Sequence, residues 1–133
     1  MATVGDMMAC GVLRAEDFDR AKRFYTEVLG LTLVHEAAGP PREAILSAGQ
    51  GTMICIYARP GMPAPQNTAL AFRVPADGFE AFVEQARDRG VVFEEYDLPE
   101  VGLKTINSIA EMNERKRAWF KDPEGNIIGL VSM

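Results

Sequence analysis

Residues with metal-binding or redox side chains are scarce in this chain. Its 133 residues include one histidine, His35, and two cysteines, Cys10 and Cys55. Histidine and cysteine are the main zinc ligands, and non-haem iron sites need two histidines and a carboxylate. No Cys-x-x-Cys spacing occurs, and in a reducing compartment we expect both cysteines to be free thiols. His35 follows a predicted helix and is interpreted as an ordinary strand residue.

Clusters of positive charge and long apolar runs are also absent. The net charge is −5 and the isoelectric point is about 4.9, which disfavour nucleic acid and anionic membranes as partners. No run approaches the roughly 18 apolar residues of a membrane span. The first residues lack the basic start and apolar core of a secretory signal. We therefore expect a cytoplasmic protein, and the 47% apolar and 25% charged residues are typical of a globular domain.

A repeated pattern is the most informative feature that is present. A predicted strand at residues 8–14 precedes apolar residues at helical spacing in residues 15–30, with Asp17 as the expected cap and Gly30 as the stop. Sixty residues later a strand at 68–74 precedes a predicted helix at 76–90. Asp77 and Gly90 stand at the equivalent positions, and Asp77 and Glu80 have capping-box spacing.

Strand-like segments follow each helix. They lie at 31–36, 43–48 and 52–58 after the first, and at 91–96, within 102–107, at 117–121 and at 126–131 after the second. The polar segment 107–116 predicts a loop or a short helical turn. Prolines and glycine at 59–67 predict a linker. The fold class is therefore predicted to be α+β: one domain over residues 1–133, built from two βαβββ modules at about 6–58 and about 68–133.

The closing segment has the chemistry of a tight turn between two strands. In "DPEGN", Pro123 presets a turn dihedral, Asp122 can accept bonds from the backbone ahead of it, and Gly125 can adopt positive φ.

Three stretches together resemble the vicinal oxygen chelate superfamily, also called the glyoxalase/bleomycin resistance/dioxygenase group. They are "EDFDRAKRFYTEVLGL", "ALAFRVPADGFEAFVEQARDRGVVF" and "AWFKDPEGNIIGL", in the family's order and spacing. The resemblance implies a mixed sheet curled into a cup, helices outside it, a ligand inside, and in many members a homodimer. Metal-dependent members carry four ligands, and those positions correspond here to Cys10, Cys55, Ala69 and Gly129.

The resemblance thus implies that the usual metal site is missing. Alanine and glycine have no side-chain donor, and a catalytic zinc needs about three protein ligands. No metal or other cofactor is predicted. Cys10 and Cys55 are interpreted as packing residues, although a soft-metal site and a redox pair stay open as alternatives.

Strand alternation selects the residues that could line the cup. The candidate ligand-binding residues are Cys10, Cys55, Tyr57, Trp119, Lys121 and Gly129. Trp119 and Tyr57 could instead belong to the core or an interface, and Lys121 could be solvated. No catalytic residue is assigned, because no nucleophile motif or phosphate loop occurs.

Our leading hypothesis is metal-free binding of a small aromatic or amphiphilic molecule, for sequestration or as a pathway accessory protein. The alternative is an enzyme of the superfamily, a lyase, isomerase or dioxygenase-like member, with an atypical metal site or metal-free acid/base chemistry. A third possibility is that the protein's own side chains fill the cup and that the protein acts through its interface.

Overall fold

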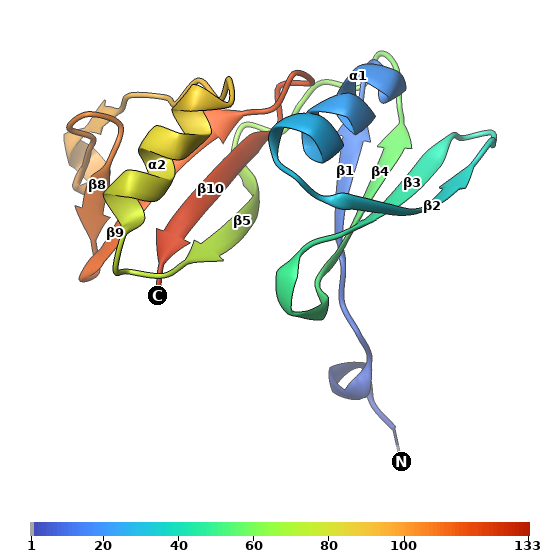
Figure 1. Cartoon of the computed structure of the whole chain (residues 1–133), viewed down its shortest axis with the longest axis horizontal. Helices are drawn as coiled ribbons and strands as arrows, with labels where there is room; N and C mark the ends of the chain where they lie inside the picture. The colour runs from blue at the N-terminus through green and yellow to red at the C-terminus, as the bar shows by residue number, and fades with distance from the viewer. Residues whose placement is uncertain (1) are drawn as a thin grey trace.

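The computed structural model describes residues 2–133 and consists of two modules lying side by side (Figure 1). Module one contains β1 (Gly11–Ala15), α1 (Phe18–Arg23), the π-helical turn η2 (Phe24–Val28), β2 (Thr32–Ala37), β3 (Glu43–Ser47) and β4 (Met53–Ala58). Module two contains β5 (Thr68–Val74), α2 (Phe79–Asp88), β6 (Asp97–Leu98), β7 (Leu103–Lys104), β8 (Ala110–Met112), β9 (Arg115–Lys121) and β10 (Ile127–Ser132). Short 3-10 turns are η1 (Val4–Asp6), η3 (Gly49–Gly51) and η4 (Pro99–Val101).

The two modules have the same sheet topology. The strand order is β1-β4-β3-β2 in the first sheet and β5-β10-β9-β8 in the second. In each sheet the first and last strands of the module pair in parallel, and the other neighbours are antiparallel. The predicted α+β fold with two repeated modules is confirmed.

Each sheet has one face covered by a helix and one face without a helix. In module one Leu13 and Ile54 pack with Tyr25 on the helix side, and in module two Ile128 and Leu130 lie in the same buried core. Alternate residues along each strand therefore point away from the helices. We call these two helix-free surfaces the open faces of sheet one and sheet two.

The edge strands β1 and β5 lie next to each other, so the two sheets meet at this line. A Cβ placed on Gly11 in β1 would approach Leu70 Cδ1 in β5 to 3.0 Å. Glycine at position 11 thus lets the two modules come close together.

Two segments differ from their prediction. Residues 91–96 form only an isolated bridge, Phe93 with Phe120, because the Glu95 carboxylate organises a loop: it accepts bonds from Thr105 Oγ1 at 2.6 Å and Ser108 Oγ at 2.8 Å. Residues 107–116, predicted as a loop or helical turn, contain β8, which pairs with β9. The strand was missed because its few residues are stabilised by pairing rather than by an apolar pattern.

The two helix starts also differ from each other. Asp17 caps α1, since its Oδ1 accepts a bond from Arg20 N at 3.1 Å. At α2 the cap position is Gly78, with φ of 87°, and no side chain caps the helix. The predicted capping box of Asp77 is therefore wrong: the chain enters this helix one residue later, through a left-handed glycine.

This difference predicts unequal effects of two matched substitutions. Asp17→Ala removes a cap bond and should lower the free energy of unfolding by about 1 kcal/mol. Asp77→Ala removes an exposed side chain without a cap bond and should change it by less than about 0.5 kcal/mol. Urea unfolding of both variants checks this, and equal losses would contradict the assignment of the caps.

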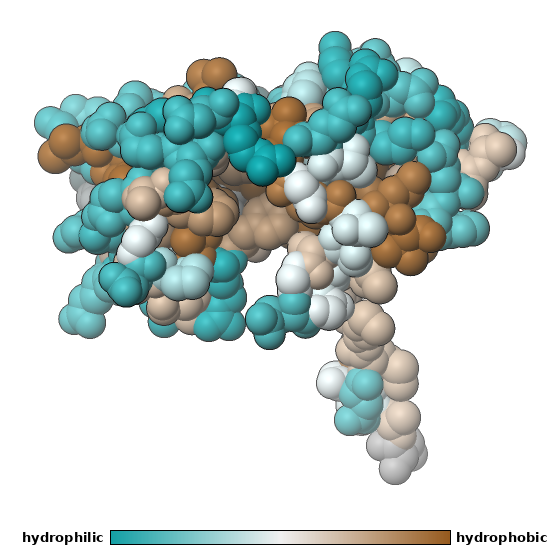
Figure 2. Space-filling view, in the orientation of Figure 1, coloured by the Kyte–Doolittle hydropathy of each residue, from teal (hydrophilic) through white to brown (hydrophobic). Residues whose placement is uncertain are grey.

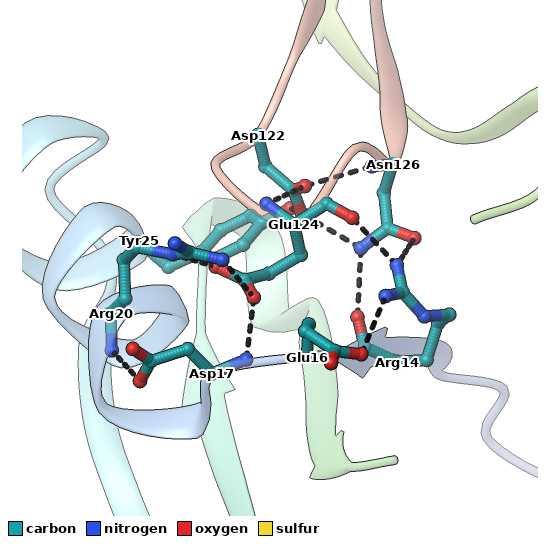
Figure 3. Close-up of polar contacts among 8 residues, drawn as sticks. All are labelled: Arg14, Glu16, Asp17, Arg20, Tyr25, Asp122, Glu124 and Asn126. Atoms are coloured by element: carbon teal, nitrogen blue, oxygen red, sulfur yellow. Dashed lines mark hydrogen bonds and ion pairs between the residues drawn. The ribbon is translucent and has the colours of Figure 1, made fainter. Parts of the chain in front are cut away.

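A buried polar network joins the turn between β9 and β10 to module one (Figure 3). Asp122, which is 4% exposed, accepts bonds from Tyr25 Oη at 2.7 Å, Asn126 Nδ2 at 2.8 Å and the backbone N of Glu124 and Asn126 at 2.9 and 2.8 Å. Burial, followed by the charge of Asp122, raises the pKa of Tyr25, which keeps the phenol protonated as a donor.

The same turn also contacts the end of β1 and the start of α1. Glu124 accepts bonds from Asp17 N at 2.7 Å and Arg20 Nε at 2.8 Å. Arg14 Nη1 donates to Glu124 O at 2.7 Å, and Asn126 Nδ2 donates to Arg14 O at 2.9 Å. The predicted turn is confirmed, with Gly125 at φ of 88°. Its side chains fix how the two modules meet.

Candidate functional site

The open face of sheet two carries an aromatic side chain beside two very small ones. Gly129 in β10 is paired with Ala71 in β5 on one side and with Trp119 in β9 on the other. Because paired residues on neighbouring strands point to the same side of a sheet, these three residues share the open face. Their neighbours Ile128 and Phe120 are in the core, as the alternation predicted.

Gly129 makes room for the Trp119 indole. A Cβ at position 129 would lie 3.5 Å from both Cδ1 and Nε1 of Trp119 and 3.4 Å from Thr68 Cγ2. The pyrrole edge of the indole thus rests against the glycine backbone of the next strand. Glycine at position 129 thus accommodates an aromatic ring on the neighbouring strand.

Tyr96 holds the indole from another direction. Its ring meets Trp119 edge to face, with centroids 5.7 Å apart and an interplanar angle of 74°. Such aromatic pairs contribute about 0.5–1.5 kcal/mol beyond the area they bury. The half-buried indole is therefore held in place before any ligand arrives.

Cationic side chains lie on both sides of this aromatic pair. Lys121 occupies the next open-face position of β9, where its Nζ is 3.6 Å from Glu94 Oε1. In the opposite direction Val131 of β10 pairs with Arg73 of β5 and Arg117 of β9, so both arginines share the open face. The sequence analysis named Lys121 as a candidate but neither arginine. Arg73 could have been found, because it alternates with Ala69 and Ala71 along its strand and so shares their face.

Of the other predicted residues, Cys55 and Tyr57 lie on the open face of sheet one, whereas Cys10 lies outside the sheet. Val12, Cys55 and Ile45 form a row across β1, β4 and β3, and His35 of β2 pairs with Ile45. Tyr57 pairs with Arg14 in the next row. Val12 in β1 is 59% exposed, so the apolar face is not covered at this position. Cys10 is exposed and lies just before β1, because the strand predicted at residues 8–14 begins only at Gly11.

The two thiols are poorly placed for a disulfide. Cys55 pairs with Val12, two residues beyond Cys10. That offset separates the two Cα atoms by roughly 8 Å, more than a disulfide spans. Burial raises the pKa of the Cys55 thiol, and the charges of Glu43 and Cys10 add to this. A raised pKa lowers the thiolate fraction that redox exchange requires.

The residues that the resemblance aligns with metal-ligand positions do not fit a metal centre. Ala69 and Gly129 offer no ligand atom, and the space next to Gly129 is taken by the indole. Within residues 2–133, no three histidine, cysteine, aspartate or glutamate side chains come together in a way that could hold a metal ion.

A separate cleft of about 570 Å³ lies on the helix side, between the two modules (Figure 2). Its walls include Leu31 from module one and Phe72, Phe82 and Ala86 from module two. Arg89 bridges the modules at this cleft by donating to Val28 O at 3.0 Å and Glu27 O at 3.2 Å. None of the six predicted binding residues lines this cleft. Arg73 and Arg89 both border it, and Arg89 is already bonded to the two backbone carbonyls.

The chain belongs to the Glyoxalase/Bleomycin resistance protein/Dioxygenase superfamily, whose model matches residues 6–130. The resemblance inferred from the sequence is thus confirmed. The comparison with curated proteins gave no match. Within residues 2–133, no helix has the length and apolar character needed to cross a bilayer.

Solved structures share the fold at low sequence identity. A glyoxalase family protein from Enterococcus faecalis has a TM-score of 0.71 and 21% identity, with 97% of this chain and 99% of that chain covered. The fosfomycin resistance protein FosX from Listeria monocytogenes, complexed with Mn(II) and sulfate, has a TM-score of 0.65 and 13% identity, with 96% and 92% covered. An integron cassette protein from the mobile metagenome of the Halifax Harbour Sewage Outfall has a TM-score of 0.69 and 16% identity, with 96% and 100% covered. Identities this low establish a shared fold and nothing about ligands.

Proposed function

We propose that the protein binds a small aromatic molecule on the open face of sheet two, without a metal ion. The observation that carries the proposal is the Trp119 indole, lodged against Gly129 and held by Tyr96 on a face that no helix covers. A fixed, half-exposed indole supplies a large stacking surface at little cost in conformational entropy. Cys55 and Tyr57, on the adjoining open face, are the further lining residues of this proposal.

The metal-free part of the proposal rests on the side chains at the family's ligand positions. Two of the four positions have no donor atom, and a tryptophan ring occupies the space of one of them. Binding is therefore assigned to stacking and polar contacts, and no reaction step is assigned to the site.

The proposed biological role is sequestration of a small molecule or an accessory role in a pathway. Resistance has a precedent in this fold, since FosX is a fosfomycin resistance protein. We also propose a cytoplasmic homodimer. The segment before β1 projects from the body (Figure 1), and its exposed Val4, Met7 and Met8 side chains support a covering partner.

Calorimetric titration with naphthoate tests the proposal, using protein treated with a chelator. Saturable binding is expected, and Trp119→Ala should weaken it about tenfold, which corresponds to about 1.4 kcal/mol of lost stacking. Phe82→Ala is the matched control, because Phe82 is a half-exposed aromatic residue at the helix-side cleft.

Two outcomes would overturn the proposal. If Phe82→Ala abolishes binding while Trp119→Ala does not change it, the ligand occupies the cleft instead. If naphthoate binds only after a divalent metal is added back, the metal-free assignment is wrong.

A further inference from the structure

Two arginines on the open face of sheet two have no ionic partner. Six of the other lysines and arginines form ion pairs with carboxylates at 3.6 Å or closer: Arg20, Lys22, Arg42, Arg87, Lys116 and Lys121. Among the described residues, no carboxylate lies within 4.0 Å of Arg73 or Arg117. Acidic residues are not scarce, with 19 acidic against 14 basic side chains. Five other cations also have no carboxylate within 4.0 Å among the described residues: Arg23, Arg59, Arg89, Lys104 and Arg115. What sets Arg73 and Arg117 apart is that both lie on the open face, one on each side of Val131.

One N–H group of the Arg117 side chain also has no partner among the described residues. This group is Nε, and it is buried. A buried polar N–H group without a partner is rare in native proteins and costs free energy unless something binds to it. Arg14 Nε has the same property, so the missing partner alone does not mark a ligand site. An anion bound at the Arg117 guanidinium would supply the negative charge that the neighbouring side chains do not.

The register places both arginines next to the aromatic pair. Arg73 and Arg117 flank Val131, so their side chains extend from strands on either side of one apolar residue. Arg117 and Trp119 alternate along β9, and two residues along a strand span about 7 Å. An aromatic ring stacked on the indole would therefore hold an attached acid group within reach of the guanidinium groups.

We infer that the ligand of this face is an aromatic molecule carrying an oxyanion, held by stacking on Trp119 and by charge-assisted hydrogen bonds from Arg73 and Arg117. The inference rests on the proposed function and adds the chemical class of the ligand. Guanidinium binds carboxylate and phosphonate through the same planar array of donors, so the shared chemistry is an oxyanion on an aromatic ring. Lys121 is less suited to this role, because Glu94 already neutralises its charge.

The test compares naphthoate with neutral naphthamide, which has the same ring system, by calorimetry on the intact chain. Wild-type protein should bind naphthoate at least about tenfold more tightly than naphthamide. Arg117→Gln and Arg73→Gln should each weaken naphthoate about tenfold and leave naphthamide within about twofold. Naphthylphosphonate, titrated in parallel, distinguishes the two oxyanions, since the tighter of the two acids identifies the group that the site prefers.

The control variant is Arg23→Gln, which removes the same charge from an exposed position on α1. It should leave both affinities unchanged, because a single distant surface charge is screened by salt. Equal weakening by Arg23→Gln would show that net charge, and not the site, attracts the acid.

Other outcomes separate this inference from the proposed function. If naphthoate and naphthamide bind with equal affinity and Trp119→Ala weakens both, the inference that the ligand carries an oxyanion is overturned, and the proposal of aromatic binding stands. Unchanged naphthoate binding in Arg117→Gln, together with loss of a dimer in sedimentation, assigns the arginines to an interface and overturns the inference. No binding of either compound overturns the proposed function and the inference with it.

Discussion

Replacing Asp122 with alanine is expected to lower the free energy of unfolding by about 3–5 kcal/mol. The carboxylate is 4% exposed and accepts bonds from Tyr25, Asn126 and two backbone N–H groups. Alanine would leave these donors buried without an acceptor, and each unsatisfied group costs about 1–3 kcal/mol before relaxation. Chemical denaturation monitored by circular dichroism measures the loss.

Two further variants make this result specific to the network. Tyr25→Phe removes one donor and should cost about 1–2 kcal/mol, less than Asp122→Ala. Asp77→Ala, at an exposed aspartate, serves as the control and should unfold like the wild type. An Asp122→Ala protein as stable as the Asp77→Ala protein would mean that the network does not join the modules.

The second large effect is expected at Gly129, where a leucine should weaken naphthoate binding at least about 30-fold, equivalent to about 2 kcal/mol. A Cβ at this position meets the indole at 3.5 Å, so a longer side chain has to displace Trp119 from the sheet. Because the chain has one tryptophan, its fluorescence reports the displacement directly.

Gly129→Ala is the matched control for this variant. Its single added methyl group makes ordinary contacts of 3.4–3.5 Å, so the indole can stay in place and binding should be close to that of the wild type. If Gly129→Leu binds naphthoate as tightly as Gly129→Ala, the position of the indole against β10 is not what creates the site.

Much of the fold could be predicted because its signals are local. The apolar spacing that matched residues 68–74 to β5 and the glycines that end both helices act over a few neighbouring residues. The prediction failed where contacts between distant residues determine the secondary structure. β8 forms through pairing with β9, and Glu95 holds residues 91–96 in a loop. The cap of α2 was predicted wrongly because Gly78, in a left-handed conformation, occupies the cap position instead of Asp77.

The site was only partly predictable for the same reason. The strand pairing places Trp119, Lys121 and Gly129 on one face, as alternation along single strands indicated, and their role in binding stays a prediction. The arginines were missed because Arg73 and Arg117 become neighbours only through β10, which pairs with both of their strands. The polar network likewise joins Tyr25 to a residue 97 positions away, which no local pattern indicates.

The most direct measurement follows the Trp119 indole N–H signal by NMR while naphthoate is added to chelator-treated protein. With one tryptophan in the chain, this signal is unambiguous. We expect a saturable shift of the indole signal, with the largest backbone shifts at Ala71, Arg117 and Gly129. An indole signal that does not move, with shifts confined to Phe82, Ala86 and other residues of the helix-side cleft, would contradict a ligand site on the open face of sheet two.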